Sequence, residues 1–171
     1  FKQKTAYEIR PRDWSSDVCS SDLVTHVRQN GAMNCLISSE TQDLALLRKK
    51  LAETPDMAGL ELASKVTTAT PYELGNPKSP IRIAVLDFGT KQHILTCMVD
   101  RGAFVKVFPA QTKMQELKAF QPNGYFISNG PGDPAVMDYA IATVKEVLKE
   151  KKPTFGICLG HQLIALASGL Q

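Results

Sequence analysis

The chain has 171 residues, of which 43% are hydrophobic and 22% are charged, with 20 basic and 17 acidic side chains. This is the composition of a soluble globular protein, and no window approaches the roughly 18 consecutive apolar residues that a membrane-spanning helix needs. We therefore expect no membrane partner and, because the N-terminus shows no signal peptide, a cytoplasmic location. The net charge of +3 is spread without clusters, which argues against nucleic acid as a partner.

Residues 1–23 do not fit the rest of the chain. They show neither helical nor strand periodicity and could bury little, which is typical of a disordered tail. However, Lys2–Ile9 and Asp13–Leu23 both resemble in-frame translations of a synthetic adapter used in DNA sequencing, in the right order. We therefore exclude this segment from fold reasoning and assign no function to Trp14 or Cys19.

The next stretch of the chain predicts little buried core. Leu44, Leu47 and Leu51 lie at helical spacing and predict a short helix, and a second short apolar run follows over residues 60–66. These apolar positions are too few for an independent core.

A proline-rich segment then marks the expected domain boundary. Residues 71–80 carry three prolines and one glycine, which favours an extended connector between a first domain at 24–70 and a second at 81–171. The alternative is a surface loop within one domain.

After residue 80, short apolar runs alternate with helical patterns, which predicts βαβ units and an α/β fold with a doubly wound parallel sheet. The runs are Ile81–Leu86, Phe104–Phe108, Gly124–Ser128 and Thr154–Ile157. One helix is expected over 113–120 with a capping box from Thr112 to Gln115, and another from Asp133-Pro134 onwards. The apolar face of the second helix would consist of Val136, Ala140, Ile141, Val144 and Leu148. Because ligands bind at the carboxyl ends of such strands, the loops after the runs are the expected place for a site.

The pattern Gly156-x-Cys158-x-Gly160 follows the last apolar run and opens a helical pattern. It is the thiol counterpart of the nucleophile elbow, in which small residues on both sides permit the sharp turn that lifts a nucleophile out of the sheet. A thiolate at a helix N-terminus is also favoured by the helix dipole. Cys158 is therefore the candidate nucleophile, and the alternative is a buried structural cysteine.

The loop SNGPGDP, from Ser128 to Pro134, carries two glycines around a proline. Such a loop leaves N–H groups exposed and lets the main chain approach a ligand closely, as an oxyanion hole requires. Alone, it is an ordinary tight turn before a helix. Its place one βα unit before Cys158, on the same edge of the sheet, makes the pair of motifs more specific.

The other cysteines and histidines do not suggest a second site. No CxxC spacing or histidine pattern accompanies the cysteines, so we expect neither a disulfide framework nor a metal site. His26 and His93 are interpreted as surface or packing residues. The cysteines are Cys19, Cys35, Cys97 and Cys158.

Two of these motifs together resemble a known family. FGICLGHQ at 155–162 and SNGPGDP at 128–134 are similar to the class I (triad) glutamine amidotransferases. The resemblance implies a flavodoxin-like α/β fold, here a partial doubly wound parallel sheet.

Two further segments narrow the resemblance. LDFGTKQHIL at 86–95 and GLELASKVTTATPY at 59–72 resemble the small-subunit family of glutamine-hydrolysing carbamoyl-phosphate synthase. The resemblance then covers 24–171, with 24–70 as the remnant of an N-terminal domain and 81–171 as the first part of the amidotransferase domain. The amidotransferase components of anthranilate and aminodeoxychorismate synthase are the nearest alternatives.

The resemblance implies a role for each matching residue. Cys158 would attack the side-chain amide carbon of glutamine, giving a glutamyl thioester and ammonia. The N–H groups of Leu159 and Gly130 would form the oxyanion hole, while Gly132 and Gln162 would hold the other end of the substrate. Ammonia would pass to a large synthetase subunit, which would use its own ATP and magnesium to make carbamoyl phosphate for arginine and pyrimidine synthesis. No cofactor is expected in this subunit.

The resemblance also implies residues that the printed sequence lacks. Family members take a general-base His and its orienting Glu from a segment beyond the elbow, whereas this sequence ends at Gln171. His161 belongs to the shared CLGHQ motif, three positions along the same helix as Cys158, and is interpreted as structural. We therefore expect the 171-residue chain to be inactive and poorly folded, with an exposed sheet edge.

Three other functions are weighed against this one. A kinase-like nucleotide site on Asp87-Phe88-Gly89 would need the glycine-rich loop over ATP, the VAIK lysine and the HRD loop of kinases, none of which the sequence contains. This tripeptide is therefore better interpreted as a turn. A non-catalytic module would use the sheet only to dock a partner subunit. A generic hydrolase would use the same thiol elbow on another substrate.

Overall fold

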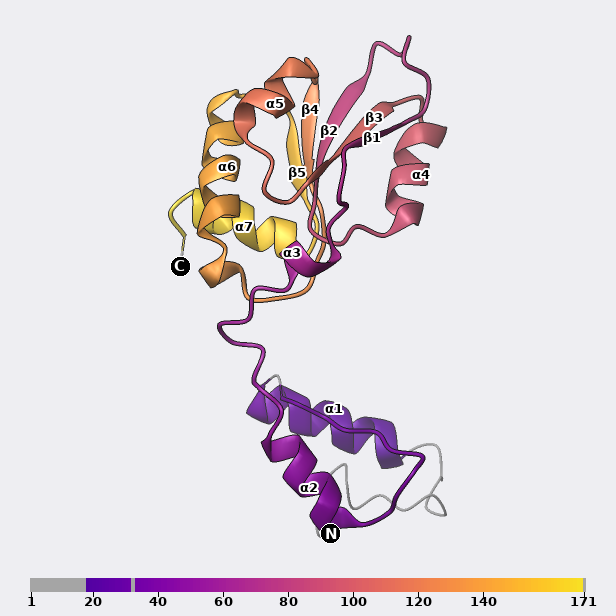
Figure 1. Ribbon diagram of the computed structural model, residues 1–171, viewed down its shortest axis with the longest axis vertical. Helices are drawn as coiled ribbons and strands as arrows, with labels where there is room; N and C mark the ends of the chain where they lie inside the picture. Colours follow the sequence, from indigo (N-terminus) through magenta and orange to yellow (C-terminus); the bar gives the residue numbers. More distant parts are fainter. Residues whose placement is uncertain (1–17, 32, 171) are drawn as a thin grey trace. The chain divides into compact units, whose positions relative to one another are not determined.

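The computed structural model describes residues 18–31 and 33–170 (Figure 1). By its contacts the chain divides into two units, Phe1–Asp56 and Met57–Gln171. The division therefore lies between Asp56 and Met57, whereas the proline-rich segment predicted it at 71–80. The reason is that residues 57–80 make hydrogen bonds and strand pairs within the second unit, which are described below.

The described residues of the first unit form two helices, α1 (Val18–Asn30) and α2 (Leu44–Ala52). The prediction that residues 1–23 lack helix is wrong from Val18 onwards, because Ser and Asp carry only a modest helix penalty and α1 continues through the following residues. The remainder of that prediction, with Trp14, lies outside the described residues. No described side chain between residues 24 and 56 is buried, which agrees with the expected lack of an independent core.

The second unit is built on one five-stranded sheet. Its strands are β1 (Tyr72–Leu74), β2 (Arg82–Asp87), β3 (Phe104–Pro109), β4 (Gly124–Ile127) and β5 (Thr154–Gly156), in the order β1-β3-β2-β4-β5. The four strands from β2 to β5 are parallel, so the predicted parallel sheet is confirmed.

Strand β1 is the part of the sheet that the sequence pattern missed. It pairs antiparallel with β3, and Glu73 lies opposite Lys106 with 2.8 Å between its Oε1 and the Lys106 Nζ. Only three residues long, it lies within the segment that was expected to be a connector. Tyr72 and Leu74 pack against the core, but three residues are too few for a periodic pattern to reveal the strand.

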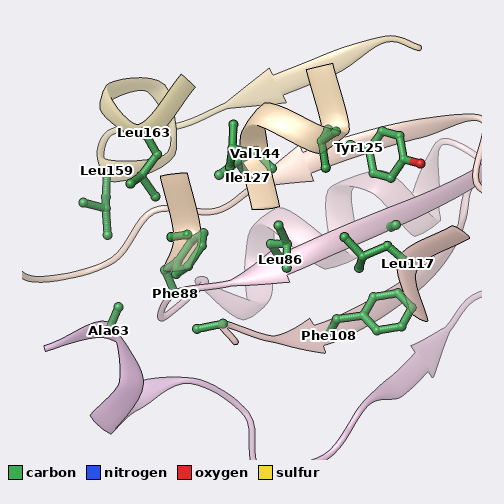
Figure 2. Close-up of a cluster of buried hydrophobic side chains, with 14 of the residues drawn as sticks. Ala63, Leu86, Phe88, Phe108, Leu117, Tyr125, Ile127, Val144, Leu159 and Leu163 are labelled. Carbon is green, nitrogen blue, oxygen red and sulfur yellow. The ribbon is translucent and has the colours of Figure 1, made fainter. Parts of the chain in front are cut away.

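Helices cover both faces of the sheet. Figure 1 shows α4 (Gln92–Asp100) on one side and α5 (Met114–Ala119), α6 (Asp138–Lys149) and α7 (Leu159–Ala167) on the other. The larger core lies beneath the three helices, where Leu159 and Leu163 of α7 pack near Ile127 and Val144 (Figure 2). Phe126 is buried in the smaller core under α4. Phe155 of β5 stacks on it with 6.3 Å between ring centroids but is 65% exposed.

Two predicted helix starts need correction. No capping box forms at α5, because the helix begins at Met114 after Lys113, while the Thr112 N–H donates to the Pro109 carbonyl in a preceding turn. The helix expected from Asp133-Pro134 is divided into a 3-10 turn, η2 (Pro134–Val136), and α6. Val136 is therefore exposed, whereas Ala140, Val144 and Val147 carry the buried face.

No helix in the described part of the chain combines the length and the apolar character that crossing a membrane would take.

Candidate active site

Cys158 lies on a sharp turn between a strand and a helix. Strand β5 ends at Gly156 and α7 begins at Leu159, so Cys158 occupies the N-cap position. Its backbone has φ +50° and ψ −111°, a conformation that non-glycine residues rarely adopt. The residue is exposed. The turn therefore presents the thiol at the carboxyl end of β5, where the Gly-x-Cys-x-Gly pattern predicted it.

The two glycines beside Cys158 are required by close packing. A Cβ on Gly160 would lie 2.1 Å from the Ile127 carbonyl oxygen, and one on Gly156 would lie 2.6 Å from the Gly160 carbonyl. Neither space can hold a methyl group, because the obstructing atoms are backbone. The first turn of α7 thus rests directly on the end of β4, which fixes the position of the elbow.

The start of α7 leaves a backbone donor uncommitted. The Gly160 N–H donates to the Ile157 carbonyl (2.9 Å) and the Gln162 N–H donates to the Cys158 carbonyl (3.1 Å). For the Leu159 N–H, the described residues supply no acceptor. The Leu159 side chain is buried in the core, whereas those of His161 and Gln162 are exposed on the first turn. The Leu159 N–H is thus a free donor at the start of a helix, which is what anion binding there requires.

The glycine-rich loop, residues 128–133, follows β4, the strand beside β5. A Cβ on Gly130 would lie 2.0 Å from the Phe88 carbonyl oxygen, so this glycine allows two loops to touch. Gly132 has φ +106°, which only glycine adopts readily. Because β4 and β5 are parallel neighbours, the loop and Cys158 lie at the same sheet edge, as the sequence predicted.

Ser128 and Asn129 hold the first half of this loop. The buried Ser128 hydroxyl accepts from the Phe88 N–H (2.8 Å) and donates to the Asn129 carbonyl (2.8 Å). The Asn129 side-chain amide donates to the Gly89 carbonyl (3.0 Å). The loop is thus tied to the turn that follows β2.

That turn contains the Asp87-Phe88-Gly89 tripeptide. The Asp87 carboxylate is buried and accepts from three backbone N–H groups, those of Gly89 (3.0 Å), Thr90 (2.8 Å) and Thr68 (2.7 Å). Backbone donors therefore occupy both of its oxygens. This geometry is that of a strand-end turn and offers no support to a nucleotide site.

The second half of the glycine-rich loop contacts a segment that sequence reasoning did not connect with the site. We call residues 59–64 the strap. The Asp133 N–H donates to the Leu60 carbonyl (2.9 Å), and the Gly59 N–H donates to Asp133 Oδ2 (2.8 Å). The Tyr139 hydroxyl on α6 donates to Glu61 Oε1 (2.9 Å). In the sequence, only the family resemblance of 59–72 pointed to this segment.

The contacts between the strap and its neighbours shift the pKa values of Glu61, Asp133 and Tyr139. Burial raises the pKa of Glu61, but hydrogen bonds from Ser64 and Tyr139 outweigh burial and leave that pKa below its ordinary value. Hydrogen bonds from the N–H groups of Gly59 and Ala135 lower the pKa of Asp133. Burial and the neighbouring Glu61 raise the pKa of Tyr139. The two carboxylates are therefore held in their charged forms.

The remaining cysteines and histidines lie elsewhere. Cys35, Cys97 and Cys158 are free thiols. Cys97 Sγ lies 3.6 Å from His93 Nε2 on α4, and the His26 ring contacts the side chain of Asn30 on α1. Among the described side chains, no three His, Cys, Asp or Glu residues gather as a metal site would require.

Comparison with known proteins identifies the family. The model of the family described as "Glutamine amidotransferase class-I" matches residues 84–171, from β2 through α7. The chain belongs to this family. The class I amidotransferase resemblance of the two glycine motifs is thereby confirmed, together with the fold class that it implied.

Curated relatives of this amidotransferase chain are carbamoyl phosphate synthase small chains. That of Escherichia coli is 41% identical over 170 residues, which cover 90% of this chain and 44% of the relative. That of Chlorobaculum tepidum is 42% identical over 149 residues, 86% of this chain and 41% of the relative. The chain thus spans less than half the length of the curated relatives it matches.

Among solved structures, a Thermoplasma acidophilum protein assigned as part of a GMP synthase has a TM-score of 0.45 and 25% identity to this amidotransferase chain. The match covers 52% of this chain and 45% of that one.

Proposed function

We propose that this chain forms the glutamine-hydrolysing part of a carbamoyl-phosphate synthase small chain. The observation that carries the proposal is the position of Cys158, an exposed thiol on a strained elbow beside the glycine-rich loop. The 41% identity to a carbamoyl phosphate synthase small chain supports the assignment of this reaction to such a synthase. That residues 24–70 come from the N-terminal domain of such a chain stays a prediction.

In the proposed reaction, the Cys158 thiolate attacks the side-chain amide carbon of glutamine. The C–N bond breaks, the nitrogen leaves as ammonia after protonation, and the glutamyl thioester is then hydrolysed by water to glutamate and free thiol. The N–H groups of Leu159 and Gly130 would donate to the oxyanion, because both lie at the sheet edge that carries the thiol. Gly132 and Gln162 would hold the other end of the substrate.

The proton of the thiol requires a general base, and we do not assign this role to His161. That residue is exposed and lies three positions after Cys158, on the first turn of the same helix. The ammonia would pass to a large synthetase subunit, where ATP and magnesium would act. The absence of glutaminase activity from the 171-residue chain stays a prediction.

Directed labelling tests the thiol assignment. The complete gene product that carries this sequence is treated with a chloromethyl ketone analogue of glutamine and analysed by mass spectrometry. We expect saturable labelling of Cys158 that free glutamine prevents, while Cys35 and Cys97 serve as internal controls. Equal labelling of the three thiols, or labelling that glutamine does not reduce, would refute the proposal and favour a docking module.

Reconstitution tests the synthase assignment. The gene product is mixed with a carbamoyl-phosphate synthase large chain and, separately, with the synthase component of anthranilate synthase. We expect glutamine-dependent product only with the first partner, and loss of that product in Cys158→Ala while ammonia-dependent synthesis persists. Product with the second partner alone would overturn the assignment.

A further inference from the structure

We propose that the strap is a positioning element for the glutamine site, and that Asp133, Glu61 and Tyr139 are positioning residues that keep the glycine-rich loop in its substrate-binding shape. This inference rests on the proposed function, since it concerns the loop that carries Gly130 and Gly132. It assigns a task in that reaction to a segment that precedes the first strand of the sheet.

The first step of the argument is that the loop is held from two sides. Ser128 and Asn129 tie its first half to the turn after β2. Its second half is tied by the strap, because the Asp133 N–H and carboxylate bond to Leu60 and Gly59. The Asp133 carboxylate also accepts from the Ala135 N–H (2.9 Å) and so caps η2.

The second step is that the strap fits closely against Gly132. A Cβ at this glycine would lie 2.9 Å from the Leu60 carbonyl oxygen and 3.0 Å from the Leu62 nitrogen. The strap thus restricts a residue whose backbone is free to adopt many conformations. Ordering such a residue before the ligand arrives lowers the entropy cost of binding.

The third step is that the strap is itself anchored to the core. Ala63, the last residue but one of the strap, is fully buried beside Phe88 in the larger core (Figure 2). Glu61 accepts from the Tyr139 hydroxyl on α6 and from the N–H (2.9 Å) and hydroxyl of Ser64. Tyr139 therefore connects the strap to a helix that packs on the sheet.

The fourth step separates this task from that of the thiol. Cys158 is fixed by the packing of Gly156 at the end of β5 and of Gly160 in α7, and none of these contacts involves the strap. Release of the strap should therefore weaken glutamine binding and leave the intrinsic reactivity of the thiol unchanged. A general loss of folding would change both.

The test uses Asp133→Asn and Tyr139→Phe in the complete gene product. Asparagine can still cap η2 through its side-chain oxygen, but its amide group cannot accept from the Gly59 N–H. Tyr125→Phe is the matched control, because the buried Tyr125 hydroxyl has no hydrogen-bond partner among the described residues. Circular dichroism checks folding, and Tyr139→Phe decides the test if Asp133→Asn does not fold.

The readout is the rate of Cys158 labelling at increasing concentrations of the glutamine chloromethyl ketone. We expect the half-saturating concentration to rise about three- to tenfold in both strap variants, the effect of losing one hydrogen bond. The limiting rate, and the rate with iodoacetamide, should stay within about twofold of the unmodified protein. Tyr125→Phe should change none of the three.

An unchanged half-saturating concentration in both Asp133→Asn and Tyr139→Phe would overturn the inference. A fall in the limiting rate and in the iodoacetamide rate as large as the rise in the half-saturating concentration would also overturn it. Hydrogen exchange provides a measurement that does not depend on glutamine. The amides of Gly130, Gly132 and Asp133 should exchange faster in Asp133→Asn than in the unmodified protein, and equal exchange would contradict the proposed role of the strap. If the unmodified protein is not labelled selectively, the proposed function fails, whereas the exchange result still decides whether the strap orders the loop.

Discussion

Cys158 combines an exposed thiol with a backbone conformation that few non-glycine residues adopt. Its φ of +50° and ψ of −111° cost about 1–3 kcal/mol relative to an unstrained residue. The surrounding packing imposes this conformation, because α7 lies in backbone contact with the end of β4. The position of the thiol is therefore maintained at the expense of stability.

Replacing this residue by glycine should recover part of that free energy. We expect Cys158→Gly to be more stable than Cys158→Ala by about 1 kcal/mol, because glycine tolerates positive φ and alanine does not. Midpoints of urea unfolding would measure the difference. The same pair of changes at Cys97, inside α4, is the control and should have the opposite sign, with glycine less stable by about 1 kcal/mol. If alanine is the more stable residue at both positions, the elbow is not strained.

At the scale of elements, the contact between α7 and β4 depends on a single missing methyl group. We expect Gly160→Ala to destabilise the protein by about 3 kcal/mol, because its Cβ would meet the backbone oxygen of Ile127 and backbone cannot easily move aside. Urea unfolding with a spectroscopic probe would measure the loss. Gly102→Ala is the control, since Gly102 has φ +85° and open space around its Cβ position, and should cost only about 1 kcal/mol. Equal losses would show that α7 can shift.

The contact between the strap and the glycine-rich loop should depend on pH. Asp133 has a lowered pKa in the folded state, so its contribution to stability is present above the ordinary value of 3.8 and is lost as the pH falls through the lower, folded value. We therefore expect Asp133→Asn to be less stable than the unmodified protein at neutral pH.

The difference should shrink towards zero as the pH falls below about 4, because a protonated aspartate resembles asparagine. Urea midpoints at several pH values between about 3 and 7 would follow this trend. A gap that stays constant over this range would show that the carboxylate charge contributes nothing.

The sequence predicts an element when a local apolar pattern marks it, and fails when the element depends on contacts with other parts of the chain. The four parallel strands carry apolar β-branched and aromatic runs, so their pattern alone located β2 to β5. Strand β1 was missed because its three residues are too few for a periodic pattern, and a local pattern does not show their pairing with β3. The capping box at Thr112 was wrong because a turn on Pro109 competes for the same residues.

At the scale of the whole molecule, the two units differ in burial. Helices α2 and α6 each carry exposed lysines, but α6 buries Ala140, Val144 and Val147, whereas α2 buries no residue. Local opening costs little free energy where nothing is buried. The first unit should therefore be the part of the molecule that opens most readily.

Limited digestion with trypsin would reveal this difference. We expect cleavage after Lys49 and Lys50 in α2 to be on the order of tenfold faster than cleavage after Lys145 and Lys149 in α6, with a fragment of the second unit persisting. A time course analysed by mass spectrometry gives both rates from one sample, so the α6 lysines serve as the control. Similar rates would show that the first unit has a stability of its own.

The sequence predicts the parts of the candidate site that lie in short contiguous motifs, and it does not show contacts between distant positions. Cys158 and the glycine-rich loop are encoded in short contiguous motifs, each following one strand, so parallel strand order brings them together. The strap contacts that loop across 74 positions, from Gly59 to Asp133. A hydrogen bond between a backbone N–H and a distant carboxylate leaves no periodicity, so only the folded chain shows it.

The exposed ring of Phe155 affects how this protein would behave in a thermal-shift assay. Such assays follow a dye that fluoresces on apolar surfaces, and they assume that the native state offers little of that surface. Here a phenyl ring that is 65% exposed, stacked on Phe126 at the sheet edge, offers the dye a binding surface before any unfolding. The native baseline of the 171-residue chain should therefore start high, and circular dichroism or calorimetry would avoid this background.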